Sequence, residues 1–235
     1  MNIEGELVKG RFIKRLNRFE AVVEIVGDQE LVHVPNTGRL RELLTENAVV
    51  LLRKYDKQGR KTKFGLLLVK KDEVWVSIDS ANVPNKIVHE GLKNKAFEQF
   101  SGYSEIRREV TMLNSRFDFG LYAGGNEYYI EVKGVTLVEG RQAFFPDAPT
   151  TRGTKHLEEL TQIKMSGMGA GVVFIIQRED ADVIRPNDMT DKEFGNALRN
   201  AKEAGVDLFS YVCKIDVEQR QINIIRSIPV ILESF

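Results

Sequence analysis

Alternation of apolar and polar residues runs through the N-terminal third of the chain. It predicts one short helix near 38–45 and strands near 6–14, 19–26, 29–34, 48–55, 64–70 and 73–78. Several short strands with one small helix are typical of a compact barrel of the oligonucleotide-binding (OB) type, although an SH3-like barrel has a similar pattern. Residues 79–84 have turn composition, so we expect one domain over residues 1–82 and a second over residues 83–235.

The spacing of apolar residues changes after this boundary. Helices are predicted near 84–100, 152–166 and 191–204, with Thr150 or Thr151 as the N-cap of the second. Strands are predicted near 106–112, 116–123, 127–133, 169–177, 207–215 and 220–225. The stretch 169–177 is almost wholly apolar, as expected for a strand that is covered on both faces of a sheet.

Two neighbouring strands carry charged residues at positions that can meet. Asp118 lies on the strand 116–123, and a hairpin turn at 124–126 leads to the strand that carries Glu131 and Lys133. Because side chains two apart on a strand share a face, Glu131 and Lys133 project together. On the Asp118 strand the residues expected to face the core are Phe117, Phe119 and Leu121.

These residue types suit a divalent-metal phosphodiesterase. Mg²⁺ prefers hard oxygen ligands and keeps several waters, so Asp118, Glu131 and the Val132 carbonyl would suffice to hold Mg²⁺ or Mn²⁺. Lys133 would orient the attacking water or neutralise developing charge. Glu90, on the first helix, is a candidate for a further, water-mediated metal carboxylate. The plainer alternative is a solvated sheet face with cross-strand ion pairs.

The order of elements favours the metal site. A helix, a three-stranded meander, a helix and a strand follow one another, with the acid on the second strand and the acid-x-Lys pair on the third. This order resembles the core of restriction-endonuclease-like, PD-(D/E)xK nucleases. A literal Pro146-Asp147 pair occurs later, in a loop, where it could shape the loop over the site but is not expected to bind metal.

Composition narrows the class of protein. The chain has 235 residues, a formal net charge of zero and one cysteine, Cys213, which excludes an intramolecular disulfide. It has no apolar run of membrane-spanning length, so we expect a cytoplasmic protein with no membrane partner. Charge is locally uneven, because residues 9–18 and 53–63 are rich in Lys and Arg. Arg11, Lys14 and Arg15 are therefore candidates for DNA contacts, although such runs are often only solvated edges.

Two further clusters could contact phosphate. Asn36, Thr37, Gly38 and Arg39 follow a strand and could cradle a phosphate group, or could simply cap a helix. In the first turns of the predicted helix 152–166, the candidates for contacts with the DNA backbone are Arg152, Lys155 and His156, of which His156 could also assist proton transfer. Arg116, on the Asp118 strand, is added as a DNA contact.

Four segments together resemble one family. They are residues 33–39 (HVPNTGR), 115–119 (SRFDF), 131–137 (EVKGVTL) and 145–157 (FPDAPTTRGTKHL), and they keep their order over most of the chain. They are similar to the sugar fermentation stimulation protein A family of bacteria and archaea. The resemblance implies an N-terminal OB-type barrel, a C-terminal nuclease-like domain and non-specific DNA binding. The residue before Asp118 is Phe117, where the generic nuclease signature has Pro.

The leading hypothesis is an α/β two-domain, DNA-binding protein that is largely indifferent to sequence and carries a metal-dependent nuclease site. A non-catalytic DNA-binding or regulatory protein that uses the nuclease fold as a scaffold is the alternative. A carbohydrate or metabolite enzyme is suggested only by the family name. The partner would be single-stranded or duplex DNA. A homodimer stays open, because the C-terminus is apolar up to Phe235.

Overall fold

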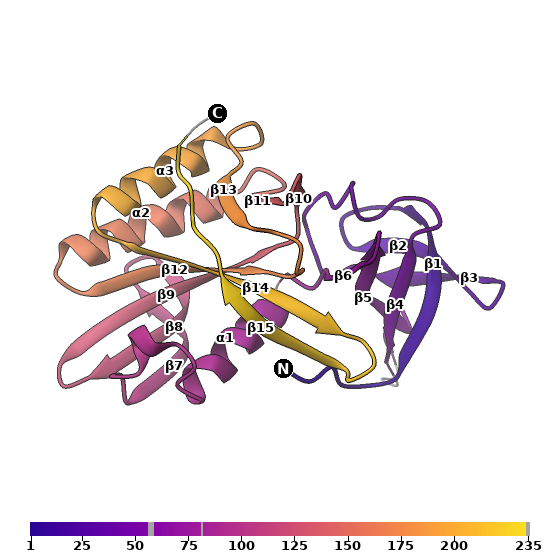
Figure 1. The fold of residues 1–235 in the computed structure, drawn as a ribbon, viewed down its shortest axis with the longest axis horizontal. Coiled ribbons are helices and arrows are strands. Elements are labelled where there is room, and N and C mark those ends of the chain that lie inside the picture. The colour runs from indigo at the N-terminus through magenta and orange to yellow at the C-terminus, as the bar shows by residue number, and fades with distance from the viewer. Residues whose placement is uncertain (56–58, 81, 234–235) are drawn as a thin grey trace.

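The N-terminal part of the chain is a closed barrel. The computed structural model describes residues 1–55, 59–80 and 82–233, and Figure 1 shows the barrel beside a larger α/β part. The strands are β1 (Leu7–Arg15), β2 (Glu20–Ile25), β3 (Asp28–His33), β4 (Val49–Lys54), β5 (Phe64–Lys71) and β6 (Val74–Ser77). They are arranged in the order β3-β2-β1-β4-β5-β6, and a parallel pairing of β3 with β5 closes five of them into the barrel.

The helix predicted near 38–45 is wrong. Residues 41–43 form a turn, and Leu40 has a left-handed φ of 51°, a conformation that interrupts a right-handed helix. Leu40 and Leu43 are fully buried among the barrel side chains. The apolar spacing that suggested an amphipathic helix therefore reflects a connection that closes the barrel core.

Arg15 holds two loops of the barrel together. Its guanidinium donates hydrogen bonds of 2.6–3.1 Å to five backbone carbonyl oxygens. These acceptors belong to the β1–β2 loop (Asn17 and Arg18) and to the loop after β3 (Asn36, Gly38 and Arg39). Arg15 was predicted to contact DNA, but its donors are already engaged by the protein.

The C-terminal part is a sheet covered on both faces. Its main sheet has the order β15-β14-β12-β9-β8-β7, in which β9, β12 and β14 run parallel. In Figure 1, α2 and α3 lie together on one face and α1 lies on the other. The elements are α1 (Val83–Lys93), β7 (Glu105–Met112), β8 (Ser115–Ala123), β9 (Asn126–Val135), α2 (Thr151–Met165), β12 (Gly169–Ile176), α3 (Lys192–Glu203), β14 (Asp207–Asp216) and β15 (Gln221–Ser227).

Two elements differ from the predictions for this part. The helix expected to reach residue 100 ends at Lys93, because Lys95 adopts a left-handed φ of 53°, and a separate turn of 3₁₀ helix follows at Glu98–Phe100. A small sheet was not predicted at all, since its strands have only two to four residues. It consists of β10 (Val138–Glu139), β11 (Gln142–Phe145) and β13 (Val183–Pro186).

The two parts are joined by direct contacts. The backbone N–H of Ser77 donates to Gln177, and the Asn36 side chain donates to the carbonyl of Ile78. The N-terminus lies beside β15, where the Met1 amino group donates to the Ile222 carbonyl at 2.9 Å (Figure 1). The barrel is therefore seated against the sheet domain.

Parts of some sequence predictions fall outside the described residues. The basic run 53–63 includes residues 56–58, and the dimer contact suggested at Phe235 lies beyond residue 233. Among the helices that the structure describes, none combines the length and apolar composition needed to cross a membrane.

The role of Arg15 can be tested by truncation. Arg15→Ala leaves five carbonyl groups without their donor, so we expect it to lower the free energy of unfolding by about 2–4 kcal/mol. Lys14→Ala, at an exposed neighbouring position, should change it by less than about 0.5 kcal/mol. Thermal and urea unfolding of both variants would check this, and equal stability of Arg15→Ala and wild type would contradict it.

Candidate functional site

Asp118 lies where two strands of the sheet separate. The β8–β9 pairing runs from Ala123 and Asn126 to Phe119 and Ile130 and stops there. Beyond this point, the backbone N–H of Val132 donates instead to Asp118 Oδ2 at 2.8 Å. The carboxylate thus takes the place of a backbone acceptor and holds an opening between the strands.

β8 is irregular at this position. The pairs of β8 with β7 include Phe119 with Arg108 and Phe117 with Val110, and Glu109 between them has a left-handed φ of 53°. Phe117 packs in the core on the α2 side, whereas Phe119 stacks against His89 of α1. All three apolar residues predicted to face the core are buried, but strict alternation fails because the sheet has a core on each face and β8 changes between them.

A second polar contact fixes Asp118 from α1. Asn85 Nδ2 donates to Asp118 Oδ1 at 2.8 Å. The Asn85 side-chain oxygen is buried and has no hydrogen-bond partner among the described residues. Sequence reasoning missed Asn85, because a single asparagine in a predicted helix carries no signal of a site.

Glu131 is buried on the neighbouring strand, with 5% of its surface exposed. Its Oε1 atom lies 2.6 Å from Lys133 Nζ and 2.6 Å from His156 Nδ1. Its Oε2 atom is buried and meets no hydrogen-bond donor in the described part of the chain. One oxygen is thus held by two cationic or proton-bearing groups, while the other is free to accept a further ligand.

His156 links α2 to this carboxylate. The imidazole is buried, lies 5.7 Å from the Phe117 ring, and accepts a hydrogen bond from Arg152 Nε at 3.3 Å on its other nitrogen. The N-cap Thr150 accepts from the backbone N–H of Gly153 and begins the helix that presents both residues. His156 was predicted to contact DNA, but its burial directs it to Glu131 instead.

The electrostatics of the two carboxylates differ. Burial and the neighbouring Glu131 raise the pKa of Asp118 to about 6, against the opposing effects of the Val132 N–H, Lys133 and Asn85. Burial also acts to raise the pKa of Glu131, but Lys133 and His156 outweigh it and hold that pKa below its ordinary value. Ionised Asp118 is therefore the group whose negative charge the protein compensates least.

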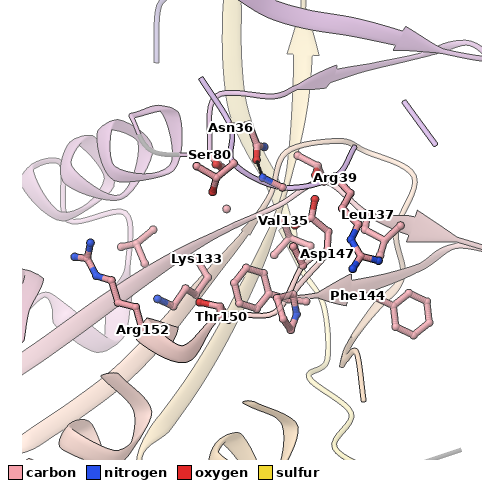
Figure 2. A pocket seen from close by; sticks show the side chains of 18 of the residues that line it. Asn36, Arg39, Ser80, Lys133, Val135, Leu137, Phe144, Asp147, Thr150 and Arg152 are labelled. Atoms are coloured by element: carbon pink, nitrogen blue, oxygen red, sulfur yellow. Dashed lines mark hydrogen bonds between the residues drawn. The ribbon is translucent and has the colours of Figure 1, made fainter. Parts of the chain in front are cut away.

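A cavity of about 660 Å³ surrounds these residues (Figure 2). Barrel and sheet domain both contribute to its wall, and Figure 2 shows Lys133 and Arg152 on one side and Arg39 and Phe144 on the other. The predicted residues that line it are Asp118, Glu131, Val132, Lys133, Asn36, Thr37, Gly38, Arg39 and Arg152. The structure thus brings most of the predicted site into one place.

The other predicted residues lie elsewhere. Glu90 Oε2 is 3.1 Å from the Met1 amino group and is not part of the cavity wall. Lys155 donates to the Asn114 carbonyl, and Arg116 lies 3.7 Å from Glu109. The remaining predicted residues outside the cavity wall are Arg11, Lys14 and Arg15.

Two cavity residues were not predicted as site residues. Arg18 comes from the β1–β2 loop and lines the cavity beside the sheet domain. Asp147, expected only to shape a loop, contacts Gly38 so closely that a Cβ atom there would find no room. Backbone N–H groups of Leu40 and Arg39 also donate to Asp147, although burial still leaves its pKa raised.

Asn36 is buried and holds the barrel loop in shape. Its side-chain oxygen accepts from the Gly38 N–H at 2.7 Å, and its nitrogen donates to Ile78. The two possibilities for the stretch 36–39 thus separate by residue: Asn36 stabilises the loop, whereas Thr37 and Arg39 are exposed at the cavity.

The oxygen atoms of the site fit a hard divalent cation. Glu131 Oε2 and Asn85 Oδ1 are buried oxygens without partners, and Asp118 carries a charge that burial disfavours. Within the described ranges, no three acidic, histidine or cysteine side chains converge as a metal-binding group. Two carboxylates with neutral oxygens suit Mg²⁺ or Mn²⁺, which keep bound waters, better than Zn²⁺, which takes nitrogen and sulfur ligands.

Comparisons with known proteins cover both parts of the chain. Residues 13–78 match the family model of the SfsA N-terminal OB domain, and residues 82–219 match that of the Sugar fermentation stimulation protein RE domain. The Sugar fermentation stimulation protein homolog of Acetivibrio thermocellus is 69% identical over 233 residues, covering 99% of this chain and 100% of that protein. The homolog of Caldanaerobacter subterraneus is 49% identical over 232 residues, with the same coverage.

A solved structure shares the whole fold. The structure of Pyrococcus furiosus SfsA in complex with Ca²⁺ has a TM-score of 0.88 and 27% identity, covering 98% of this chain and 99% of that one. This chain belongs to the sugar fermentation stimulation protein (SfsA) family. The predicted fold class is thereby confirmed: an N-terminal OB barrel precedes a restriction-endonuclease-like domain.

The raised pKa of Asp118 predicts a stability effect that depends on pH. Its pKa of about 6 in the folded chain lies above the ordinary value of 3.8, so folding disfavours the ionised carboxyl group. That penalty is absent below pH 4, grows as the pH rises through 6 and reaches at most about 3 kcal/mol. Asp118→Asn should therefore stabilise the metal-free protein at pH 8 by about 1–3 kcal/mol and have little effect at pH 4.

Thermal unfolding in EDTA at both pH values measures this difference. Asp216→Asn, in the β14–β15 turn, is the matched control and should be neutral at pH 8. An Asp118→Asn protein that is no more stable than wild type at pH 8 would contradict the electrostatic assignment.

Proposed function

We propose that this chain is a metal-dependent phosphodiesterase that acts on DNA largely without regard to base sequence. The observation that carries the proposal is the grouping of Asp118, Glu131 and Lys133 at one cavity, with two partnerless buried oxygens directed to the same place. Residues 1–82 would serve as the DNA-binding barrel and residues 83–235 as the domain that carries the chemistry.

The ligand set follows from the contacts. Asp118, Glu131 Oε2 and the Val132 carbonyl would hold Mg²⁺ or Mn²⁺, and Asn85 Oδ1 is a further oxygen on the α1 side. When bound, such an ion polarises a phosphoryl oxygen and lowers the pKa of a bound water. The family relative from Pyrococcus furiosus, solved in complex with Ca²⁺, supports divalent-cation binding, since Ca²⁺ also prefers oxygen ligands.

The protein's own groups would perform the remaining steps. Lys133, already 2.6 Å from Glu131, is placed to orient the attacking water and to neutralise charge on the phosphate as it develops. His156 acts on Glu131 rather than on substrate, because it is buried behind that carboxylate and held by Arg152. It would fix the direction of the Glu131 oxygen that remains free.

DNA contacts would come from the cavity rim. Arg18, Arg39 and Arg152 are exposed and line the cavity from both parts of the chain. Guanidinium groups bind phosphate oxygens but read no bases from such positions, so binding should depend on salt rather than on sequence.

A non-catalytic DNA-binding scaffold is the second candidate, and one observation favours it. Lys133 and His156 already neutralise much of the Glu131 charge without any metal. Asp118 argues against it, because a scaffold gains nothing from a buried carboxylate whose ionised form is disfavoured.

Cleavage of labelled DNA separates these two candidates. With Mg²⁺ or Mn²⁺ the wild-type protein should cut DNA, and EDTA should abolish cutting. Asp118→Asn should lose activity because a metal ligand is removed, and Lys133→Ala should lower kcat by about 10²-fold or more, as for a lost transition-state donor.

Asp216→Asn serves again as the control that should retain activity, since its side chain accepts a hydrogen bond from a turn distant from the cavity wall. All variants are compared at concentrations that bind the same fraction of DNA. Cutting that persists unchanged in Asp118→Asn and Lys133→Ala would exclude this site, and absence of cutting with either metal would favour the scaffold.

A further inference from the structure

The cavity is bounded by two loops that touch each other. The barrel loop 36–40 and the segment 144–150 meet where Asp147 packs on Gly38 and accepts backbone N–H groups from Arg39 and Leu40. Contact between the barrel and the sheet domain therefore continues along one side of the cavity, beyond the Asp118 and Glu131 carboxylates. A phosphate that reaches these carboxylates must pass between the two parts of the chain.

The space available matches a single strand. A pocket of about 300–1,000 Å³ holds one drug-sized molecule, and 660 Å³ is therefore room for roughly one or two nucleotides. In duplex DNA each phosphate is attached to stacked pairs, and the major groove alone is about 12 Å wide. The paired strand would meet the barrel loop or the segment 144–150 before the phosphate reached Glu131.

The β1–β2 loop supplies an aromatic surface next to the cavity. Arg18 lines the cavity, and the adjacent Phe19 has 50% of its surface exposed, as has Leu16. Phe19 belongs to the loop that Arg15 holds through the carbonyls of Asn17 and Arg18. An exposed aromatic ring beside a guanidinium, on a braced loop, is the combination that stacks an unpaired base while holding its phosphate.

We propose that DNA enters the cavity as a single strand, with Phe19 stacking an unpaired base and Arg18 holding the backbone on the way to Asp118. Duplex DNA that binds the exposed arginines is not cut until its strands separate. This inference rests on the proposed function and specifies its substrate class.

The test compares one sequence in two forms. A labelled 30-nucleotide single strand and the blunt duplex made from it are incubated with the full chain and Mn²⁺, and cleavage rates are measured under single-turnover conditions. The single strand should be cut at least tenfold faster. Equal rates for the two forms would overturn the inference while leaving the proposed phosphodiesterase intact.

A binding arm keeps the inference testable without chemistry. In Ca²⁺, fluorescence anisotropy should show that Phe19→Ala weakens single-strand affinity about tenfold, as for one lost stacking contact, and leaves duplex affinity unchanged. Ile225→Ala, on β15 with 46% of its surface exposed, is the matched control and should change neither.

The two failures can be distinguished. If no metal supports cutting of either form, the proposed function fails, and the binding arm decides the inference alone. A Phe19→Ala effect confined to the single strand would then support single-strand entry. An effect of equal size on both forms, or on neither, would overturn it.

Discussion

The hydrogen bond from the Val132 N–H to Asp118 is the contact on which the candidate site depends. It lies where the β8–β9 pairing ends, so a carboxylate replaces a backbone acceptor in the sheet. This placement buries Asp118 beside Glu131 and raises its pKa to about 6. The opening that makes a site between two strands and the electrostatic demand for a cation thus have the same structural origin.

The surroundings of the pair divide the work between the two carboxylates. Glu131 is held at one oxygen by Lys133 and His156, from the strand and from α2, which leaves the other oxygen without a partner. Asp118 is held from α1 by Asn85. Across the cavity Arg15 fixes two barrel loops, so the wall opposite the carboxylates is built before any ligand arrives. Both parts of the chain are needed to complete the cavity.

The family, the two-part architecture and most of the strands could be predicted from the sequence, because they depend on periodicity and on motifs that keep their order. Leu40 and Leu43 misled the prediction of a helix, since apolar spacing does not distinguish a helical face from a loop that plugs a barrel. Glu90 was favoured over Asn85 because an acid is the more obvious ligand. Only the packing of α1 on the sheet places Asn85 against Asp118 and leaves Glu90 beside the N-terminus. For the same reason, His156 looked like a surface contact until its burial behind Glu131 was visible.

The central claim is that Asp118 and Glu131 jointly bind a divalent cation, and anomalous diffraction from crystals of the wild-type chain grown with Mn²⁺ tests it most directly. The account predicts an anomalous peak about 2.0–2.3 Å from an oxygen of each carboxylate and close to the Val132 carbonyl, with the rest of its coordination made by water. Crystals of Asp118→Asn under the same conditions should lose the peak. A wild-type map with no Mn²⁺ at this position, under conditions where Mn²⁺ is in large excess, would contradict the account.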